Sequence, residues 1–233
     1  MQTIWLNSFV VSVYDRLTDQ DHWRRQIAST MDRVGPLPPN VRVLDLGTGP
    51  GVSAFVLASR LGPAARVTGV DFSEKMIAIA RERHRARYAS LANVDFIQAD
   101  AAAVPFSDAS FDLVVGHSVL YLTGNRKKVL AEMRRVLAPG GSLIVMEPNE
   151  NGSLWRSALA AVPAIPAHLR TPFASLRFAS SMVSWRFVAA RAGRITDAAL
   201  ETLIREAGFD SASCTPALGG LGLHGVGRIN AMS

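Results

Sequence analysis

A strand-like run that breaks into alternating glycines constrains the fold of this chain more than any other feature. Residues 41–46 predict a buried strand that carries Asp45 near its end, and the next residues read Gly-Thr-Gly-Pro-Gly. Each glycine lacks a Cβ, so the backbone can turn sharply and a ligand can lie against its N–H groups. The sequence therefore predicts a buried strand followed by a ligand-binding turn.

The carboxylate of Asp45 narrows the choice of ligand at this turn. A dinucleotide-binding loop needs Gly or Ala five residues after its first glycine, and Val52 stands there. A buried aspartate would also repel a pyrophosphate at low effective dielectric. It would attract a ligand that carries an ammonium and a sulfonium. These residues therefore favour S-adenosylmethionine (SAM) over NAD.

Strand and helix patterns alternate through the first two thirds of the chain. Further buried strands are expected at residues 67–71, 94–98, 111–116 and 143–146, with helices between them. This alternation predicts a doubly wound, mostly parallel sheet with right-handed crossovers. A last helix capped by Thr196 and two β runs near residues 209–215 and 223–229 predict a terminal hairpin at the sheet edge.

We expect four parts in the chain. They are an N-terminal helical segment or lid at 1–40, a SAM-binding core at 41–148, a basic, aromatic substrate lid at 149–195, and a last helix with the hairpin at 196–233. The single cysteine, Cys214, excludes an intrachain disulfide and suits a reducing compartment. Neither a signal peptide nor a long apolar run is found, so a cytoplasmic location is expected.

Polar residues stand where the expected strands end, which is where doubly wound sheets bind ligands. Asp71 ends the second strand, and Asp100 and His117 follow the third and fourth. Asp71 lies 22 residues beyond Gly49, close to the spacing at which an acidic residue binds ribose hydroxyls. Asp100 can accept a hydrogen bond from an exocyclic amine. Phe72 and Met76 beside Asp71 can sandwich a flat adenine, although Met76 would serve equally as helix core.

Five sequence blocks resemble those of the class I SAM-dependent methyltransferases, especially the small-molecule branch with the ubiquinone/menaquinone C-methyltransferases. The blocks are VLDLGTGPG, GVDFSEKMI, FIQADAAAVPF, FDLVVGHSVLYL and LAPGGSLIVMEP, which occur in family order within residues 41–148. The resemblance implies a seven-stranded Rossmann-like sheet. It also implies SAM as the methyl donor and S-adenosylhomocysteine as the product.

The resemblance also implies a place for each candidate residue. It puts Asp45 near the SAM amino group, Asp71 on the ribose, and Asp100 with Ala101 at the adenine amine. The residues it puts around the methionine part and the adenine are Gly47, Thr48, Gly49, Phe72 and Met76. His117 would lie beside the reacting methyl, and Tyr14 resembles an N-terminal tyrosine that closes over the cofactor. Both are candidate catalytic residues, with a backbone-only role for His117 and a structural hydroxyl for Tyr14 as the alternatives.

Methyl transfer from a sulfonium is an in-line displacement, so the protein mainly aligns the nucleophile and excludes water. The loop after the fourth strand is not the Pro-Pro-aromatic motif that holds a base amine, and Cys214 does not follow a proline in a strand-end loop. Glu147 and Glu150 are too few carboxylates for a metal site, so no metal is expected. These exclusions favour a small-molecule acceptor.

Glu147 and Asn149 follow the fifth expected strand, and they can contact that acceptor or only the loop backbone.

The positive charge of the chain, +6 in total, is concentrated in the expected lid. Residues 151–195 contain no Asp or Glu and six arginines, which are Arg156, Arg170, Arg177, Arg186, Arg191 and Arg194. Without these six, the 25 basic residues would fall to 19 and match the 19 acidic ones. They can hold an anionic, partly apolar acceptor such as a secondary metabolite, quinone or lipid precursor, or face an acidic membrane or RNA. They can equally be solvated arginines on an apolar lid.

Three other functions remain open at this point. The chain can be an RNA or lipid methyltransferase that uses the basic segment, and the RNA reading would need a continuous basic groove. It can be an enzyme of changed chemistry on the same fold, such as a cyclase, or a non-catalytic partner. The sequence does not identify the acceptor, the methylated atom or the oligomeric state.

Overall fold

The computed structural model describes residues 15, 19–155, 157 and 172–231. Tyr14, Arg156 and Arg170 lie outside this part of the chain, as does the side chain of Arg177. Across the described residues, no helix is both long enough and apolar enough to cross a membrane.

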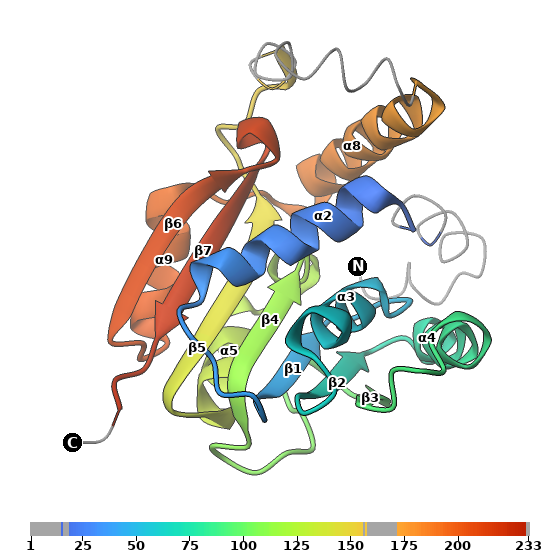
Figure 1. Ribbon diagram of the computed structural model, residues 1–233. Helices are drawn as coiled ribbons and strands as arrows, with labels where there is room; N and C mark the ends of the chain where they lie inside the picture. The colour runs from blue at the N-terminus through green and yellow to red at the C-terminus, as the bar shows by residue number, and fades with distance from the viewer. Residues whose placement is uncertain (1–14, 16–18, 156, 158–171, 232–233) are drawn as a thin grey trace.

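A seven-stranded sheet forms the centre of the molecule (Figure 1). Its strands are β1 (Arg42–Leu46), β2 (Arg66–Asp71), β3 (Val94–Gln98), β4 (Phe111–His117), β5 (Leu137–Pro148), β6 (Ser211–Ala217) and β7 (Gly222–Arg228), in the order β3-β2-β1-β4-β5-β7-β6. The first five strands are parallel, and β7 is antiparallel to both β5 and β6. The doubly wound sheet and the terminal hairpin are therefore confirmed. The strand order reverses between β1 and β4, which is where such sheets bind ligands.

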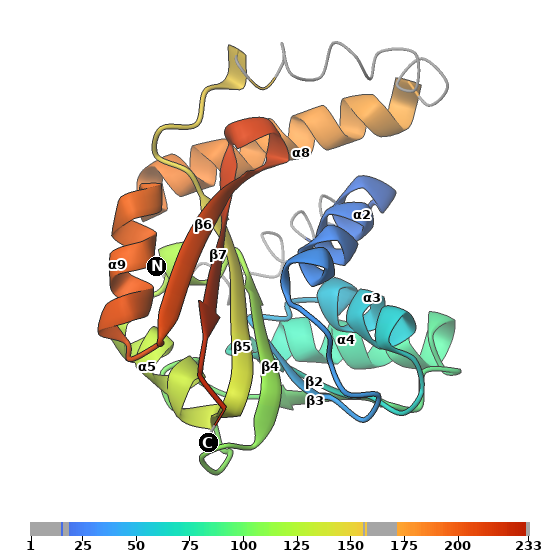
Figure 2. The ribbon, with the colours of Figure 1, turned by 60° about the vertical axis from the view of Figure 1, so that its left-hand side comes forward.

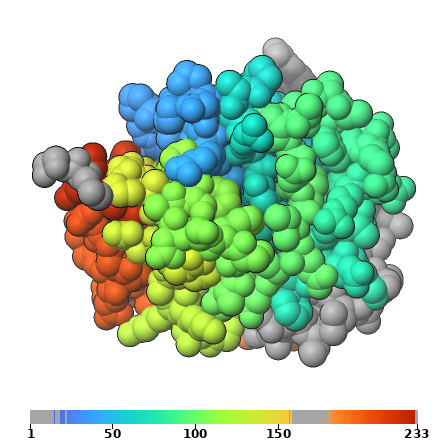
Figure 3. All heavy atoms as spheres, turned by 90° about the horizontal axis from the view of Figure 1, so that it is seen from below, coloured from blue at the N-terminus to red at the C-terminus, as the bar shows by residue number. Residues whose placement is uncertain are grey.

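Helices cover both faces of the sheet (Figures 1 and 2). On one face α3 (Val52–Leu61) and α4 (Glu74–Arg87) bury their apolar side chains against β1 to β3, and α2 (Asp21–Thr30) packs on α3. On the other face α5 (Arg126–Val136) and α9 (Asp197–Glu206) pack on β4, β5 and the hairpin. Seen from below, the orange and red residues of the C-terminal part lie at the left of the molecule, and the cyan and green residues of the first half lie at the right (Figure 3).

Two elements differ from the sequence expectation. The fifth strand begins at Leu137, directly after α5, six residues before the expected start at residue 143. A Cβ on Gly141 would lie 2.7 Å from the carbonyl oxygen of Ala138, so a glycine is needed where this strand bends. The second difference is α8 (Pro172–Ala192), a 21-residue helix inside the expected lid. Its sequence is apolar on several sides, so no amphipathic stripe marks it.

Candidate functional site

The glycine turn after β1 adopts backbone angles that require glycine. Gly47, Gly49 and Gly51 have φ values of +73°, +53° and +86°. A Cβ on Gly47 would lie 2.9 Å from Cγ2 of Val119. The backbone N–H groups of Gly47 and Thr48 both donate to the carbonyl oxygen of Val70, at 2.8 and 2.9 Å, and so fix the turn to β2. At its glycines the loop therefore presents bare backbone, and hydrogen bonds to β2 hold it in place.

Asp71, at the end of β2, joins the glycine turn to the start of α4. Its Oδ2 accepts a hydrogen bond from the N–H of Gly49 at 2.9 Å, and its Oδ1 accepts one from the N–H of Ser73 at 2.8 Å. Burial raises the pKa of this carboxyl, and the two backbone donors oppose that shift. Each carboxylate oxygen can accept a second hydrogen bond, so the group can bind a pair of hydroxyls while it holds both loops.

A pocket opens above the carboxyl ends of β1, β2, β3 and β4. Its walls are Leu46, Gly47, Gly49, Val70, Asp71, Phe72, Ser73, Met76, Ala99, Asp100, Ala101, His117, Ser118, Val119, Leu122 and Thr123. Two of these residues carry carboxylates, and none of the described wall residues is Lys or Arg. A wall of this charge suits a cation and hydroxyl groups, and it would repel a pyrophosphate.

One end of the pocket has the shape and the polar groups that an adenosine needs. Phe72 is 42 % exposed, while Met76 is buried on the first turn of α4, where Ser73 caps the helix. Asp100 follows β3, and its Oδ1 accepts a hydrogen bond from the N–H of Ala102 at 2.9 Å. The structure therefore brings together eight of the candidate residues: Gly47, Gly49, Asp71, Phe72, Met76, Asp100, Ala101 and His117.

Asp45 and Thr48 are buried but do not form part of the pocket wall. Oδ2 of Asp45 accepts a hydrogen bond from Oγ of Ser53, in the first turn of α3. Burial raises the pKa of Asp45 to about 6. A carboxylate at this position interacts favourably with the partial positive charge at the N-terminal end of α3. A direct contact of Asp45 with the SAM amino group stays a prediction.

His117 ends β4 at the opposite end of the pocket from Asp100. Neither of its ring nitrogens has a hydrogen-bond partner among the described residues. Burial, with a smaller contribution from His224, lowers its pKa to about 3, so the ring is neutral near pH 7. His117, Met146 and His224 are in register on β4, β5 and β7, and Nε2 of His224 lies 3.3 Å from Nε2 of Gln26 on α2. His117 is thus a buried polar group on the pocket wall with unused hydrogen-bonding capacity.

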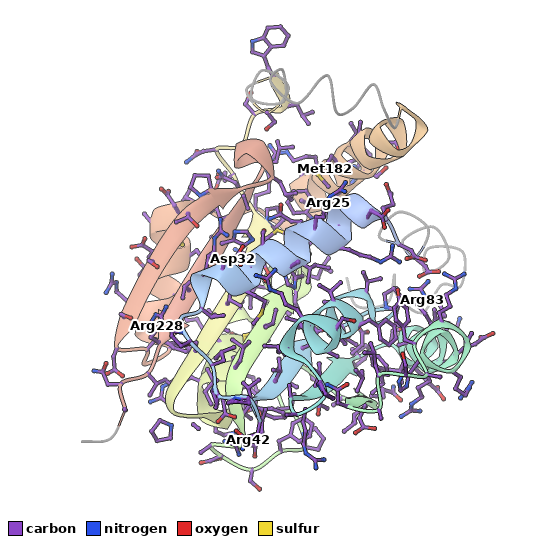
Figure 4. All side chains as sticks on the ribbon, viewed as in Figure 1. Arg25, Asp32, Arg42, Arg83, Met182 and Arg228 are labelled. Atoms are coloured by element: carbon purple, nitrogen blue, oxygen red, sulfur yellow. The ribbon has the colours of Figure 1, made fainter. Side chains whose placement is uncertain are left out.

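Two helices distant in sequence, α2 and α8, pack together beside Ser118 at this end of the pocket, and we call them its roof. Trp185 of α8 donates a hydrogen bond from Nε1 to Oγ of Ser118 at 3.0 Å, and its ring packs edge to face against Trp23 of α2. Met182 of α8 and Arg25 of α2 are labelled at this end of the molecule in Figure 4. Both helices lie in the segments expected as lids, 1–40 and 149–195, but no local pattern marks this contact, because the hydrogen bond joins residues 67 positions apart.

Glu147 and Asn149 contact the loop backbone, one of the two alternatives left open by the sequence. The buried carboxylate of Glu147 accepts hydrogen bonds from the N–H groups of Val119, Leu120 and Tyr121 at 2.8 to 3.0 Å. Burial raises its pKa to about 7 although these three donors act in the opposite direction. The Asn149 amide donates to the carbonyl oxygen of Gly220 and accepts from the N–H of Asn151. Glu147 therefore fixes the pocket wall at residues 119–122.

The described arginines of the lid have different roles. Arg186 donates hydrogen bonds to the carbonyl oxygens of Asn149 and Gly152, both at 2.6 Å, so it joins α8 to the segment after β5. The guanidinium of Arg191 lies 3.7 Å from the centre of the Phe187 ring on the exposed side of α8. Within the described residues, no group of three or more His, Cys, Asp or Glu side chains is arranged to hold a metal ion.

Comparisons with known proteins agree on one family. A model of the family described as a methyltransferase domain matches residues 37–208. The chain is 32 % identical over 216 residues to a demethylmenaquinone methyltransferase of Lactococcus lactis, covering 86 % of this chain and 79 % of that relative. It is 42 % identical over 125 residues to a Thermus thermophilus protein of the same name, covering 54 % of this chain and 53 % of that relative.

Solved structures of low sequence identity share the fold. A SAM-dependent methyltransferase from Aquifex aeolicus superimposes with a TM-score of 0.68 at 16 % identity, over 94 % of this chain and 98 % of that one. A Thermotoga maritima SAM-dependent methyltransferase, titled as a possible histamine N-methyltransferase, gives a TM-score of 0.64 at 19 % identity, over 98 % of this chain and 99 % of that one. At such identities the likeness concerns the fold alone.

Proposed function

The chain belongs to the class I SAM-dependent methyltransferases, and we propose that its acceptor is a small, largely apolar ring compound of the reduced naphthoquinone type. The observation that carries this proposal is one continuous pocket with two different ends. One end has two carboxylates beside the glycine turn. The other has the apolar side chains of Val119 and Leu122, two hydroxyl residues and a neutral imidazole, and no charged side chain among the described residues. Relatives named demethylmenaquinone methyltransferase support the same class of acceptor.

The carboxylate end of the pocket fits the adenosine of SAM. Asp71 has free acceptor capacity for the two ribose hydroxyls, and Phe72 and Met76 flank the space for the adenine. Asp100 and Ala101 are placed to meet the adenine amine edge. When bound, SAM supplies a methyl group already activated on a sulfonium. The bare backbone of Gly47 and Gly49 lets the methionine part lie close to the loop.

The other end of the pocket has features that orient an acceptor. Val119 and Leu122 supply apolar contacts, and Trp185 of the roof is hydrogen-bonded to Ser118 of the pocket wall. A neutral ring nitrogen of His117 can accept a hydrogen bond from an acceptor hydroxyl, and this contact would turn the adjacent ring carbon toward the methyl. Because burial holds its pKa near 3, we assign His117 an orienting contact rather than storage of the proton.

Methyl transfer to isolated acceptors tests this proposal. We expect label from methyl-labelled SAM to enter demethylmenaquinol, supplied in reduced form in detergent, and not catechol, histamine or transfer RNA. The apolar wall and the neutral imidazole are the reasons for this preference. Scintillation counting of the separated fractions measures the transfer. Measurable SAM binding together with transfer to RNA alone, or to none of these acceptors, would overturn the proposed acceptor.

Variants of His117 test the orienting contact. We expect His117→Ala to lower kcat for the quinol by roughly 30-fold, while the Kd for SAM changes less than threefold, because one aligned hydrogen bond is lost. His117→Gln supplies another acceptor atom and should recover part of the rate. The wild-type rate should show no ionisation of His117 near pH 6.5, since burial keeps the ring neutral to about pH 3. A fall in rate near pH 6.5 that disappears in His117→Gln would contradict this role.

A further inference from the structure

Exposed apolar side chains are concentrated in one part of the molecule. Large hydrophobic residues are exposed at six described positions, and five of these lie between residues 154 and 188: Leu154, Trp155, Val183, Phe187 and Val188. The sixth, Phe72, belongs to the pocket. Trp155 is 72 % exposed and Phe187 is 61 % exposed. Single exposed apolar residues are ordinary, but a group of this kind marks a contact surface.

Helix α8 is apolar on two opposite sides. Met182, Trp185 and Ala189 are buried on the inner side, where Met182 and Trp185 belong to an apolar cluster with Trp23 and Met146. Val183, Phe187 and Arg191 follow one another at four-residue intervals, so they form one exposed stripe on another side of the helix. A surface helix of a globular protein normally presents charged or polar residues to water on its outer side. The exposed apolar stripe of α8 therefore indicates that this side of the helix contacts a further partner.

The charge of the segment that contains this stripe indicates the kind of partner. By sequence, residues 151–195 contain six arginines and no acidic residue. Of the arginines whose side chains the structure describes, Arg191 has its guanidinium over the exposed Phe187 ring. A partner must therefore be negatively charged and also receive aliphatic side chains. A second copy of the chain would bring two arginine-rich segments together, which like charge opposes. RNA offers phosphates and base faces but no apolar phase for Leu154, Val183 and Val188.

We propose that the outer stripe of α8, together with Leu154 and Trp155, docks the protein on the surface of an anionic lipid bilayer. A bilayer surface offers negative headgroups above an apolar layer, and helices with basic and aromatic residues lie in that interface. Arg186 joins α8 to the carbonyl oxygens of Asn149 and Gly152, close in sequence to Leu154 and Trp155. Figures 1 and 2 show α8 and the gold segment that contains residues 154 and 155 at the same end of the molecule.

The same helix connects the docking surface to the pocket. Trp185 contacts Ser118, which is part of the pocket wall, while Val183 and Phe187 are exposed on α8. Docking would bring the roof of the pocket against the apolar layer in which a ring compound with an apolar tail is dissolved. The docking surface does not depend on the proposed acceptor, because its evidence is the exposure and charge of residues outside the pocket.

Sedimentation with vesicles tests the docking surface. We expect the full chain to bind vesicles of phosphatidylglycerol and phosphatidylcholine in equal parts, and to bind pure phosphatidylcholine much more weakly. The double variant Val183→Ser with Phe187→Ser should bind the anionic vesicles about tenfold more weakly, because two apolar side chains no longer enter the interface. Arg191→Gln should weaken binding about fivefold, as expected for one basic residue near an anionic surface.

The control is Arg66→Gln, which removes one exposed positive charge at the start of β2, far from α8 (Figure 1). This variant should bind vesicles like the wild type, and all variants should bind SAM with unchanged affinity. Equal vesicle binding by the double variant would overturn the proposal. So would a wild-type dimer, detected by light scattering, that the double variant converts to monomers, or binding to transfer RNA in preference to vesicles. Vesicle binding without methyl transfer to the quinol would refute the proposed acceptor alone.

Discussion

Replacement of Asp71 by Ala should weaken SAM binding by about 100-fold. The carboxylate accepts hydrogen bonds from the N–H groups of Gly49 and Ser73, and we propose that it also accepts two from the ribose. Hydrogen bonds to a charged group contribute about 1.5–3 kcal/mol each, so even one full contact and part of a second account for ~2.7 kcal/mol, or 100-fold. The variant also loses the link between the glycine turn and α4. Isothermal titration calorimetry measures the Kd.

Two further variants separate the ribose contact from a general loss of structure. Asp71→Asn keeps the shape and one carbonyl acceptor, so its SAM affinity should lie between those of the wild type and Asp71→Ala. Asp95→Ala removes an exposed carboxylate of the neighbouring strand β3 and should bind SAM normally. Circular dichroism and thermal melting check that each variant is folded. A folded Asp71→Ala chain with wild-type affinity for SAM would refute the ribose contact.

The carboxylate end of the pocket was predictable because its geometry is local to strand ends. Parallel strands buried on both faces have continuous apolar sequences, so their ends can be located, and the residues that follow them meet at one edge of the sheet. Asp71, Asp100 and His117 reach the pocket in this way. The glycines of the turn are equally informative, since positive φ values restrict those positions to glycine.

Lids were expected at residues 1–40 and 149–195, but the contacts that hold α2 and α8 in place were not predictable, because they join residues distant in sequence. Trp185 bonds to Ser118 and packs on Trp23, and neither contact has a local signal. The hydrogen bond from Ser53 of α3 to Asp45 also had no local signal. Asp45 is buried and is not part of the pocket wall, and its contact with the SAM amino group stays a prediction. The place expected for Tyr14 lies outside the described residues and stays a prediction.

Replacement of Glu147 by Ala should lower the free energy of unfolding by about 3–9 kcal/mol. The reason is that three buried N–H groups, those of Val119, Leu120 and Tyr121, would lose their acceptor, and each unsatisfied group costs about 1–3 kcal/mol. A domain of this kind is stable by about 5–15 kcal/mol, so the loss is a large share of the total. Thermal melting should show a midpoint roughly 10–20 °C lower.

Glu147→Gln distinguishes hydrogen bonding from the space that the side chain fills. The Gln carbonyl can keep the donors of Val119 and Leu120, which both bond to Oε1, but its amide would face the N–H of Tyr121. We expect a loss of about 2 kcal/mol, the cost of one unsatisfied group. Glu150→Ala, an exposed carboxylate three residues on, should change stability by less than about 0.5 kcal/mol. If Gln and Ala at position 147 were equally stable, the three hydrogen bonds would not be what holds the wall at Val119.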